Sequence, residues 1–350
     1  MKILDTTYQA SFPEVRIKKS ILHEAALGIA AVTNKAIYKT LDHDNLYWEN
    51  HRPFSRKLEK ELEEAEKNNT WKVVLDLLQE QDFQDIAEFK KYINTLSETE
   101  FRMRSLPYLG PALENTGKRA AAADKQAIEL MKDSINEHAF FPSLVTHVCV
   151  TPIKVLREHI INLITLWYEE IIIPNKKELF EVLRSDMQAK QNMKQQLSAK
   201  AFVQWVLDYN EYEPEPGVTE IILIPQVTYR PWVIYSERKK RKIFYYPVDD
   251  ESLQERIDPY KPHFKMVQRY KALGDENRLK MLKLLSEKDR TLKELTEAIG
   301  MGKTTVHHHV TLLRSARLVA AEGSKYRLQT HLLGVESKQL LNYLNMEEME

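Results

Sequence analysis

The sequence predicts a mostly α-helical protein with a small β component, and three observations support this fold class. Apolar residues recur every three or four positions through most of residues 14–210, a spacing typical of helices. Runs rich in β-branched and aromatic residues follow at about residues 218–248, where we expect a short antiparallel strand segment. Near the carboxy terminus the pattern changes again, to short helices with a glycine turn and a hairpin. We therefore expect a mainly helical amino-terminal domain over residues 1–260 and a second domain over residues 261–346.

The composition is that of an ordinary soluble globular protein. The 350 residues include 43% hydrophobic and 29% charged side chains, close to the average for globular domains. The single cysteine, Cys149, excludes an internal disulfide and a cage of several thiolates around a metal. It lies in the apolar run 144–150, so we expect it to be a small buried residue.

No segment has the pattern of a targeting or membrane-spanning sequence. The first ten residues, MKILDTTYQA, lack the apolar stretch of a signal peptide. The most apolar helix candidate, residues 153–173, has only nine uncharged residues in a row, from Ile160 to Tyr168, whereas a spanning helix needs about 20 apolar residues. We expect a buried core helix there, and a cytoplasmic protein that does not enter a membrane.

Further helices are expected on both sides of this segment. Residues 56–71 are rich in charge, with oppositely charged residues four positions apart. Residues 112–139 predict one long helix, because the four alanines at 120–123 strongly favour helix. Residues 175–209 contain one or two more helices.

A breaker segment at residues 211–217 separates the helices from three short runs of strand character. Prolines bound these runs, which suits short edge strands because proline cannot donate to a neighbouring strand. The runs are Thr219–Ile224, Trp232–Ser236 and Ile243–Tyr246, and the prolines are Pro225, Pro231 and Pro247.

This strand segment has two features that allow alternative interpretations. The basic run Arg238–Lys242 is either a solvated hairpin tip or an extra contact to phosphate. The aromatic residues either line an amphipathic pocket for a small-molecule effector or belong to the core and to interfaces. They are Tyr229, Trp232, Tyr235, Phe244, Tyr245 and Tyr246, with Arg230 among them.

Charge is distributed unevenly along the chain, although the net charge is zero. Residues 263–345 hold 15 Lys and Arg against 8 Asp and Glu, a net charge of +7, whereas residues 1–262 hold 36 against 40. A basic module on a slightly acidic body is typical of proteins with a nucleic-acid partner.

The second domain is predicted to begin with a capped helix. Asp275 is placed to accept hydrogen bonds from the first amides of a helix that runs to about Glu287. The spacing of Leu279, Leu282 and Leu285 directs them inward.

The next segment reads as two helices joined by a tight turn. Residues 291–294, TLKE, have the pattern of a capping box at the start of the first of these helices. Its apolar residues Leu292, Leu295 and Ile299 point to the core. The turn is Gly300–Gly302, where glycine accepts the positive φ angle that tight turns require.

The following helix, Lys303–Arg317, is predicted to have two faces. Val306, Val310 and Leu313 lie on the face that packs on the preceding helix. The opposite face carries residue types that hydrogen-bond to base edges and phosphates in the major groove. The candidate DNA contacts are Lys303, Thr304, Thr305, His307, His308 and Thr311 of this helix, with Lys325 and Arg327 of the hairpin at residues 318–328. Two helices and a hairpin in this order have the layout of a winged helix-turn-helix.

Two motifs in this domain resemble those of ArsR-type bacterial repressors, which show an ALxDxxRLxIL helix and a recognition helix similar to SxSTVSHHLxxL. They are ALGDENRL at residues 272–279 and TTVHHHV at residues 304–310. The resemblance covers about residues 265–330 and implies a winged-helix homodimer that binds an imperfect palindrome, with its first and last helices at the dimer interface. It implies that the groove-facing residues are Lys303, Thr304, His307 and His308.

The large amino-terminal region resembles a long-chain subgroup of ArsR-like regulators, and this resemblance implies no function for that region. Two positions of the recognition helix depart from the family pattern, because its second serine is His307 here and its lysine after the helix centre is Thr311. The base preference of the family therefore cannot be carried over.

The metal sites of related sensors are not expected here. Residues 292–299 contain neither the cysteine pair that such sensors often carry nor a histidine. The last helix offers only His331 and Glu336, too few ligands for a site. The run His307–His309 cannot converge on one ion because adjacent helical residues point in different directions. We expect no metal and no cofactor, and we expect His309 to be a half-buried packing residue.

Two other patterns have a chemical interpretation that we do not favour. Residues 300–305, GMGKTT, resemble the end of a phosphate-binding loop, but Glu297 stands where the first glycine is needed. Residues 42–44, with His51, form an acidic-histidine cluster, which we interpret as a polar loop.

The sequence therefore predicts a sequence-specific, double-stranded-DNA-binding transcriptional regulator of ArsR type that is a homodimer and a repressor, and that is not an enzyme. One alternative is an enzyme or ligand-sensing protein with an appended winged helix. Another is a winged helix used for protein contacts, against which the basic charge and the polar outer face of the helix argue.

Overall fold

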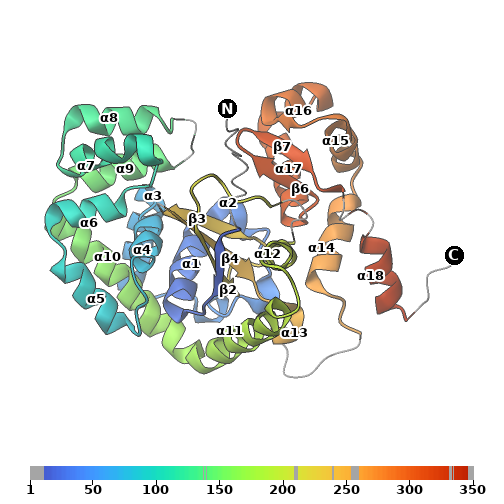
Figure 1. Cartoon of the computed structure of the whole chain (residues 1–350), viewed down its shortest axis with the longest axis horizontal. Coiled ribbons are helices and arrows are strands. Elements are labelled where there is room, and N and C mark those ends of the chain that lie inside the picture. The colour runs from blue at the N-terminus through green and yellow to red at the C-terminus, as the bar shows by residue number, and fades with distance from the viewer. Residues whose placement is uncertain are drawn as a thin grey trace, which may run out of the picture. The chain divides into compact units, whose positions relative to one another are not determined.

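The computed structural model describes residues 12–136, 138, 140–208, 212–238, 240–253, 260–330, 333 and 335–345 (Figure 1). The mostly α-helical class with a small β component is confirmed. The chain divides into two compact units, residues 1–248 and 249–350, and each is described by itself. Residues 254–259, next to the expected boundary at residue 260, lie outside the described residues, so this boundary stays a prediction. Within the described part of the chain, no helix is both long enough and apolar enough to cross a bilayer.

Helices make up most of the amino-terminal unit (Figure 1). Those of eight residues or more are α1 (Ile21–Thr33), α3 (Arg56–Asn68), α4 (Trp71–Leu78), α5 (Ile86–Thr95), α6 (Glu98–Ser105), α7 (Glu114–Ala121), α8 (Lys125–Asp133), α9 (Phe141–Val150), α10 (Ile153–Trp167), α11 (Ile173–Lys194) and α12 (Ala199–Leu207). The short helix α2 (Lys35–Tyr38) follows α1.

Helix α1 is the central helix of this unit. Its Ala-rich sequence has apolar residues on all sides, and eleven of its 13 residues are buried, as expected for a helix inside a core. Gly28 is required by its packing, because a Cβ atom there would lie 2.7 Å from Cζ2 of Trp167 in α10. Cys149 in α9 is buried, as expected.

The expected long helix at residues 112–139 is wrong, because the structure has two helices there, α7 and α8. The chain turns at Ala123, whose φ angle is +63°. Asp124 then caps α8 by accepting hydrogen bonds from the amides of Gln126 and Ala127 at 3.0 and 3.2 Å. The alanine run favours helix, but a side-chain acceptor at Asp124 starts a new one.

A four-stranded sheet completes the amino-terminal unit, with strand order β1-β2-β4-β3. The strands are β1 (Glu14–Ile17), β2 (Glu220–Gln226), β3 (Ile234–Arg238) and β4 (Arg241–Pro247). Only β3 and β4 pair antiparallel, as expected, whereas β2 is parallel to both β1 and β4. The sequence pattern missed β1, which is four residues long and lies about 200 residues away from its partner β2 in the chain.

The expectation of edge strands is wrong for β2 and β4. Both are interior strands, and in each of them all residues but the first are buried. Prolines are tolerated because Pro225 and Pro247 stand at the carboxyl ends of these strands. One face of the sheet packs on α12 in a core that includes Phe202, Leu223 and Phe244.

The carboxy-terminal unit has six helices and a small sheet within the described residues (Figure 1). The helices are α13 (Asp250–Leu253), α14 (Phe264–Leu273), α15 (Glu276–Glu287), α16 (Leu292–Ile299), α17 (Lys303–Ser315) and α18 (Val335–Tyr343). The strands are β5 (Arg290–Thr291), β6 (Val319–Glu322) and β7 (Lys325–Leu328), in the order β5-β7-β6 with antiparallel pairing.

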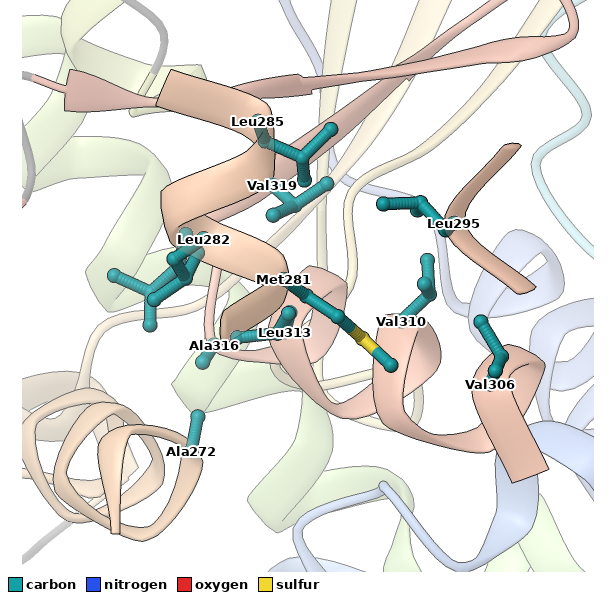
Figure 2. Close-up of a cluster of buried hydrophobic side chains, with 11 residues drawn as sticks. Ala272, Met281, Leu282, Leu285, Leu295, Val306, Val310, Leu313, Ala316 and Val319 are labelled. Atoms are coloured by element: carbon teal, nitrogen blue, oxygen red, sulfur yellow. The ribbon is translucent and has the colours of Figure 1, made fainter. Parts of the chain in front are cut away.

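The core of this unit lies between α15, α16 and α17 (Figure 2). Val306, Val310 and Leu313 of α17 are buried in it, as expected. The inward direction expected for Leu279 is wrong, because 49% of this residue is exposed, and Met281 is buried in its place. Leu282 and Leu285 are buried as expected, and α15 turns Met281 toward α17 (Figure 2).

Candidate nucleic-acid interface

The start of α16 and the turn after it set the position of α17. Thr291 accepts a hydrogen bond from the amide of Glu294 at 3.2 Å, and the Glu294 carboxylate accepts one from the amide of Thr291 at 2.7 Å. This is the capping box that the sequence predicts. Gly300 ends α16 with a φ angle of +73°, and α17 begins three residues later.

The outer face of α17 is defined here as the five residues Lys303, Thr304, Thr305, His307 and His308. All five are exposed, while Val306 and Val310 of the same helix are buried. The buried residues are held by the core of the unit (Figure 2). The face therefore presents donors and acceptors to solvent on a helix that its core fixes in place.

Thr311 is less available than the outer face. It is half-buried, and its hydroxyl donates to the carbonyl oxygen of His307 at 2.8 Å. The oxygen can still accept a hydrogen bond, but its donor capacity is used within the helix.

His309 lies on the buried side of α17 and is more enclosed than the half-buried position expected for it. It is 9% exposed, and its Nδ1 lies 3.8 Å from the carboxylate of Asp275, the residue that caps α15. Burial lowers the pKa of His309, although Asp275 acts in the opposite direction. The imidazole therefore lies beside the start of α15, and its Nδ1 has no hydrogen-bond partner among the described residues.

Strand β7 carries the two candidate residues of the hairpin. Lys325 and Arg327 are exposed, and Tyr326 and Leu328 between and after them are half-buried against the core. Arg327 makes two contacts to the carboxylate of Asp289, from Nε at 3.0 Å and from an Nη at 2.9 Å. Any phosphate contact by Arg327 would therefore compete with this ion pair.

The acidic-histidine cluster of the sequence does not form one site. The Asp42 carboxylate lies 3.2 Å from Nε of the buried Arg230. His43 contacts Glu49 at 3.1 Å, and His51 contacts Asn175 at 2.9 Å. These contacts are structural, in agreement with the polar-loop interpretation.

No group of three or more His, Cys, Asp or Glu that could hold a metal ion occurs among the described residues. The candidate ligand His331 lies outside them, and so does the side chain of Glu336. The absence of a metal site in that segment stays a prediction.

The aromatic residues of the strand segment belong mainly to the core. Tyr229 and Trp232 are buried, and the indole Nε1 of Trp232 donates to Oγ1 of Thr40 at 2.8 Å. Tyr245 is buried, and its hydroxyl accepts a hydrogen bond from Gln79 at 3.0 Å. Tyr235 differs from them, with 62% of its surface exposed.

Two residues of the basic run 238–242, Arg238 and Lys242, contact other parts of the amino-terminal unit, whereas Lys240 is exposed. Arg238 donates to the carbonyl oxygen of Arg104 at 2.5 Å. Lys242 is buried and pairs with Glu215 and Glu237, while Lys239 lies outside the described residues. Arg238 and Lys242 therefore belong neither to a fully solvated hairpin tip nor to a surface that is free to contact phosphate.

Comparisons with known proteins agree with this geometry. The family model described as Bacterial regulatory protein, arsR family, matches residues 275–321, from the cap of α15 into β6. The Transcriptional repressor SdpR of Bacillus subtilis (strain 168) is 29% identical over 80 residues, which are 22% of this chain and 89% of that protein. No solved structure gives a significant match. The family match includes the whole helix-turn-helix and most of the core beneath it, and residues 275–321 of this chain are therefore similar to the helix-turn-helix of the ArsR family.

Proposed function

We propose that this chain is a sequence-specific transcriptional regulator that binds double-stranded DNA as a homodimer and represses the genes it binds. The outer face of α17 is the observation that carries the proposal. This face has five exposed polar side chains, and the opposite side of α17 packs in the core of the unit. The helix lies within the segment that matches the ArsR family. The repressor role rests on the name of the relative SdpR.

In this proposal α17 enters the major groove. His307 and His308 read base edges, because a neutral imidazole offers one donor and one acceptor. Lys303, at the first turn, contacts a phosphate or a guanine, and Thr304 and Thr305 contact neighbouring groups. Lys325 of the β6–β7 hairpin, the wing, contacts the phosphate backbone of the DNA. Arg327 contacts it only after its ion pair with Asp289 breaks.

The proposed homodimer places two copies of α17 in successive major grooves, about 34 Å apart. Helices α14 and α18 supply the dimer surface in this proposal. They pack together within one chain, where the Arg269 guanidinium donates to Oε1 of Gln339 at 3.2 Å. The amino-terminal unit supports the dimer or binds an effector.

The test is selection of bound sequences from a random duplex library by the purified full-length protein. Enrichment of a palindrome with half-sites about one helical turn apart would support the proposal and identify the operator. No enrichment, with only weak and salt-sensitive binding, would contradict sequence-specific recognition. An interaction that does not depend on salt would favour the alternative of a winged helix used for protein contacts, because phosphate contacts weaken with salt.

Two lysine variants test which surface touches the operator. Lys303→Gln removes a cation from the outer face of α17, and we expect binding to weaken with a salt slope lower by about one per subunit. Lys293→Gln is the matched control, since Lys293 is an exposed lysine of α16 that lies outside this face. Equal effects of the two variants would contradict the proposed orientation of α17.

A further inference from the structure

A cavity of about 510 Å³ lies in the amino-terminal unit at the start of α1. Its wall is formed by the connection between β1 and α1, by the segment after α4, and by Tyr168 and α11. No local sequence pattern predicts this cavity, because these segments are far apart in the chain.

The charged side chains on the wall have an excess of positive charge. They are Lys18, Lys19 and Lys176, against one carboxylate, Asp82. Lys18 forms an ion pair with Asp82, so this pair is neutral overall. The ammonium group of Lys19 lies 4.2 Å from the ring centre of Phe180, and that of Lys176 lies 5.8 Å from the ring centre of Tyr168. Two cations therefore remain at the cavity beyond the ion pair.

His23 adds an unsatisfied polar group to the same wall. It is 3% exposed, and neither of its ring nitrogens has a hydrogen-bond partner in the part of the chain that the structure describes. Burial, with a smaller contribution from Lys18, lowers its pKa to about 3, so the ring is neutral near pH 7 and offers one donor and one acceptor. Buried polar groups in proteins are nearly always paired, so the enclosed ring of His23 leaves an unsatisfied polar group beside the cavity.

The backbone at the start of α1, like the lysines, favours a negatively charged ligand. Helix α1 has 13 residues, and Ser20 caps it by accepting from the amide of His23 at 3.4 Å. Ile21 and Leu22, which also line the cavity, are at the first positions of the helix, where amides have no acceptor inside the helix. This end of a helix favours negative charge.

Apart from the uncharged polar residues Ser20, Gln81 and Gln84, the rest of the wall is mainly apolar. It includes an aliphatic and aromatic surface that suits a hydrocarbon or ring group, formed by Leu22, Leu78, Phe83, Tyr168, Phe180 and Leu183. Small-molecule sites commonly combine an apolar wall with a few polar groups that fix orientation.

We propose that this cavity binds a small organic anion, a carboxylate or a phosphate ester with an apolar group. Lys19, Lys176 and the first amides of α1 bind the anionic group, and the ring of His23 lies close to it. The apolar group packs on the ring and aliphatic side chains of the wall. The proposal concerns ligand binding alone, so it can fail or hold independently of the proposed DNA binding.

The test measures binding of benzoate, phenyl phosphate and benzyl alcohol to the full-length protein by calorimetry. We expect saturable binding of at least one of the two anions, and benzyl alcohol at least about tenfold weaker, because it lacks the charged group. The comparison of benzoate with phenyl phosphate shows which anionic group the cavity prefers.

Three lysine variants locate the binding. Lys19→Met and Lys176→Met keep an apolar stem and remove the charge, and each is expected to raise the Kd about tenfold. Lys177→Met is the matched control, because Lys177 is an exposed neighbour on α11 that does not line the cavity. All three variants replace side chains at the surface or the cavity wall, so we expect them to keep the fold.

His23 provides an independent readout. In histidine ring ¹⁵N spectra, its signal is identified as the one missing from His23→Gln, and it is expected to shift on addition of the anion and to saturate with the same Kd. The proposal would be overturned if neither anion showed saturable binding at concentrations up to about 10 mM, which is above the Kd of even weak specific ligands. Unchanged affinity in both Lys19→Met and Lys176→Met, or equal affinity for benzyl alcohol, would also overturn it.

Discussion

Helices α1 and α17 are both 13 residues long, but they differ in how far their polar side chains are exposed to solvent. Helix α17 buries one side, which includes His309, and presents the five polar residues of its outer face to solvent. Helix α1 is buried nearly all round, and its polar residues His23 and Glu24 lie inside the unit. The difference teaches that exposed polar residues can be identified from helical spacing, whereas the role of a buried one depends on what packs against it.

Glu24 illustrates what a buried polar residue of α1 does. Its carboxylate accepts hydrogen bonds from the amides of Val227 and Thr228 at 3.0 and 2.9 Å, and from the hydroxyl of Thr228 at 2.6 Å. Burial raises the pKa of Glu24, and these hydrogen bonds act in the opposite direction. The residue therefore fixes the chain after β2 to the central helix.

The largest effect is expected from Glu24→Ala, which would leave two buried amides without acceptors. We expect the free energy of unfolding of the amino-terminal unit to fall by about 3 kcal/mol. All five tryptophans lie in residues 1–248, so tryptophan fluorescence during urea unfolding reports on this unit. Glu178→Ala, at an exposed position of α11, should change it by less than about 0.5 kcal/mol. Similar effects of the two variants would show that a buried polar residue of α1 contributes no more to stability than an exposed helix position.

The corresponding change on α17 should affect binding and leave stability alone. If His308 reads a base edge as proposed, His308→Ala weakens binding to the selected operator by about 1–3 kcal/mol and hardly changes binding to random DNA. The exposed position of His308 predicts little change in unfolding. Fluorescence anisotropy with both duplexes measures this, and equal losses on the two would mean that His308 does not read bases.

Acid should destabilise the amino-terminal unit through His23. The pKa of His23 is about 3 in the folded protein, against 6.5 for a histidine that is not buried. As the pH falls, the unfolded chain therefore takes up the proton before the folded protein does. Stability is therefore complete above pH 6.5 and is lost as the pH falls toward 3. From these two values we expect a loss of about 1.4 kcal/mol at pH 5.5, one pH unit below 6.5.

His23→Gln separates this contribution from that of other histidines. The pKa values of His138 and His147 in the same unit are also lowered by burial, so the wild-type pH profile alone contains the contributions of all three histidines. The difference between the wild type and His23→Gln, followed by tryptophan fluorescence, isolates His23. Parallel profiles for the two proteins would show that His23 is not buried as a neutral ring.

The smallest of these effects is expected at the turn that leads to α17. Thr291→Ala removes the side-chain acceptor of the capping box and should cost about 1 kcal/mol. Hydrogen exchange of amides in α16, read by mass spectrometry of its peptides, should become faster. Thr296→Ala, inside the same helix, is the comparison, and faster exchange in that variant alone would contradict the capping role of Thr291.

Much of the carboxy-terminal unit was predictable because its signals are local. The Asp275 cap, the Thr291–Glu294 capping box and the buried side of α17 depend on residues within one or two turns of each other. The error at Leu279 has a physical cause, since the apolar residues of α15 cover more than one side and spacing alone does not choose between Leu279 and Met281.

The sequence by itself determined the helical class, the helix-turn-helix and the candidate face that would meet DNA, because short-range hydrogen bonding and helical periodicity produce them. Only the tertiary structure decided the parallel pairing of β1 with β2, the burial of Glu24 and the cavity beside His23. Each of these joins segments that are distant in the chain, such as Glu24 with Thr228 and Lys19 with Phe180. Long-range packing sets such contacts, and no local pattern in the amino acids encodes them.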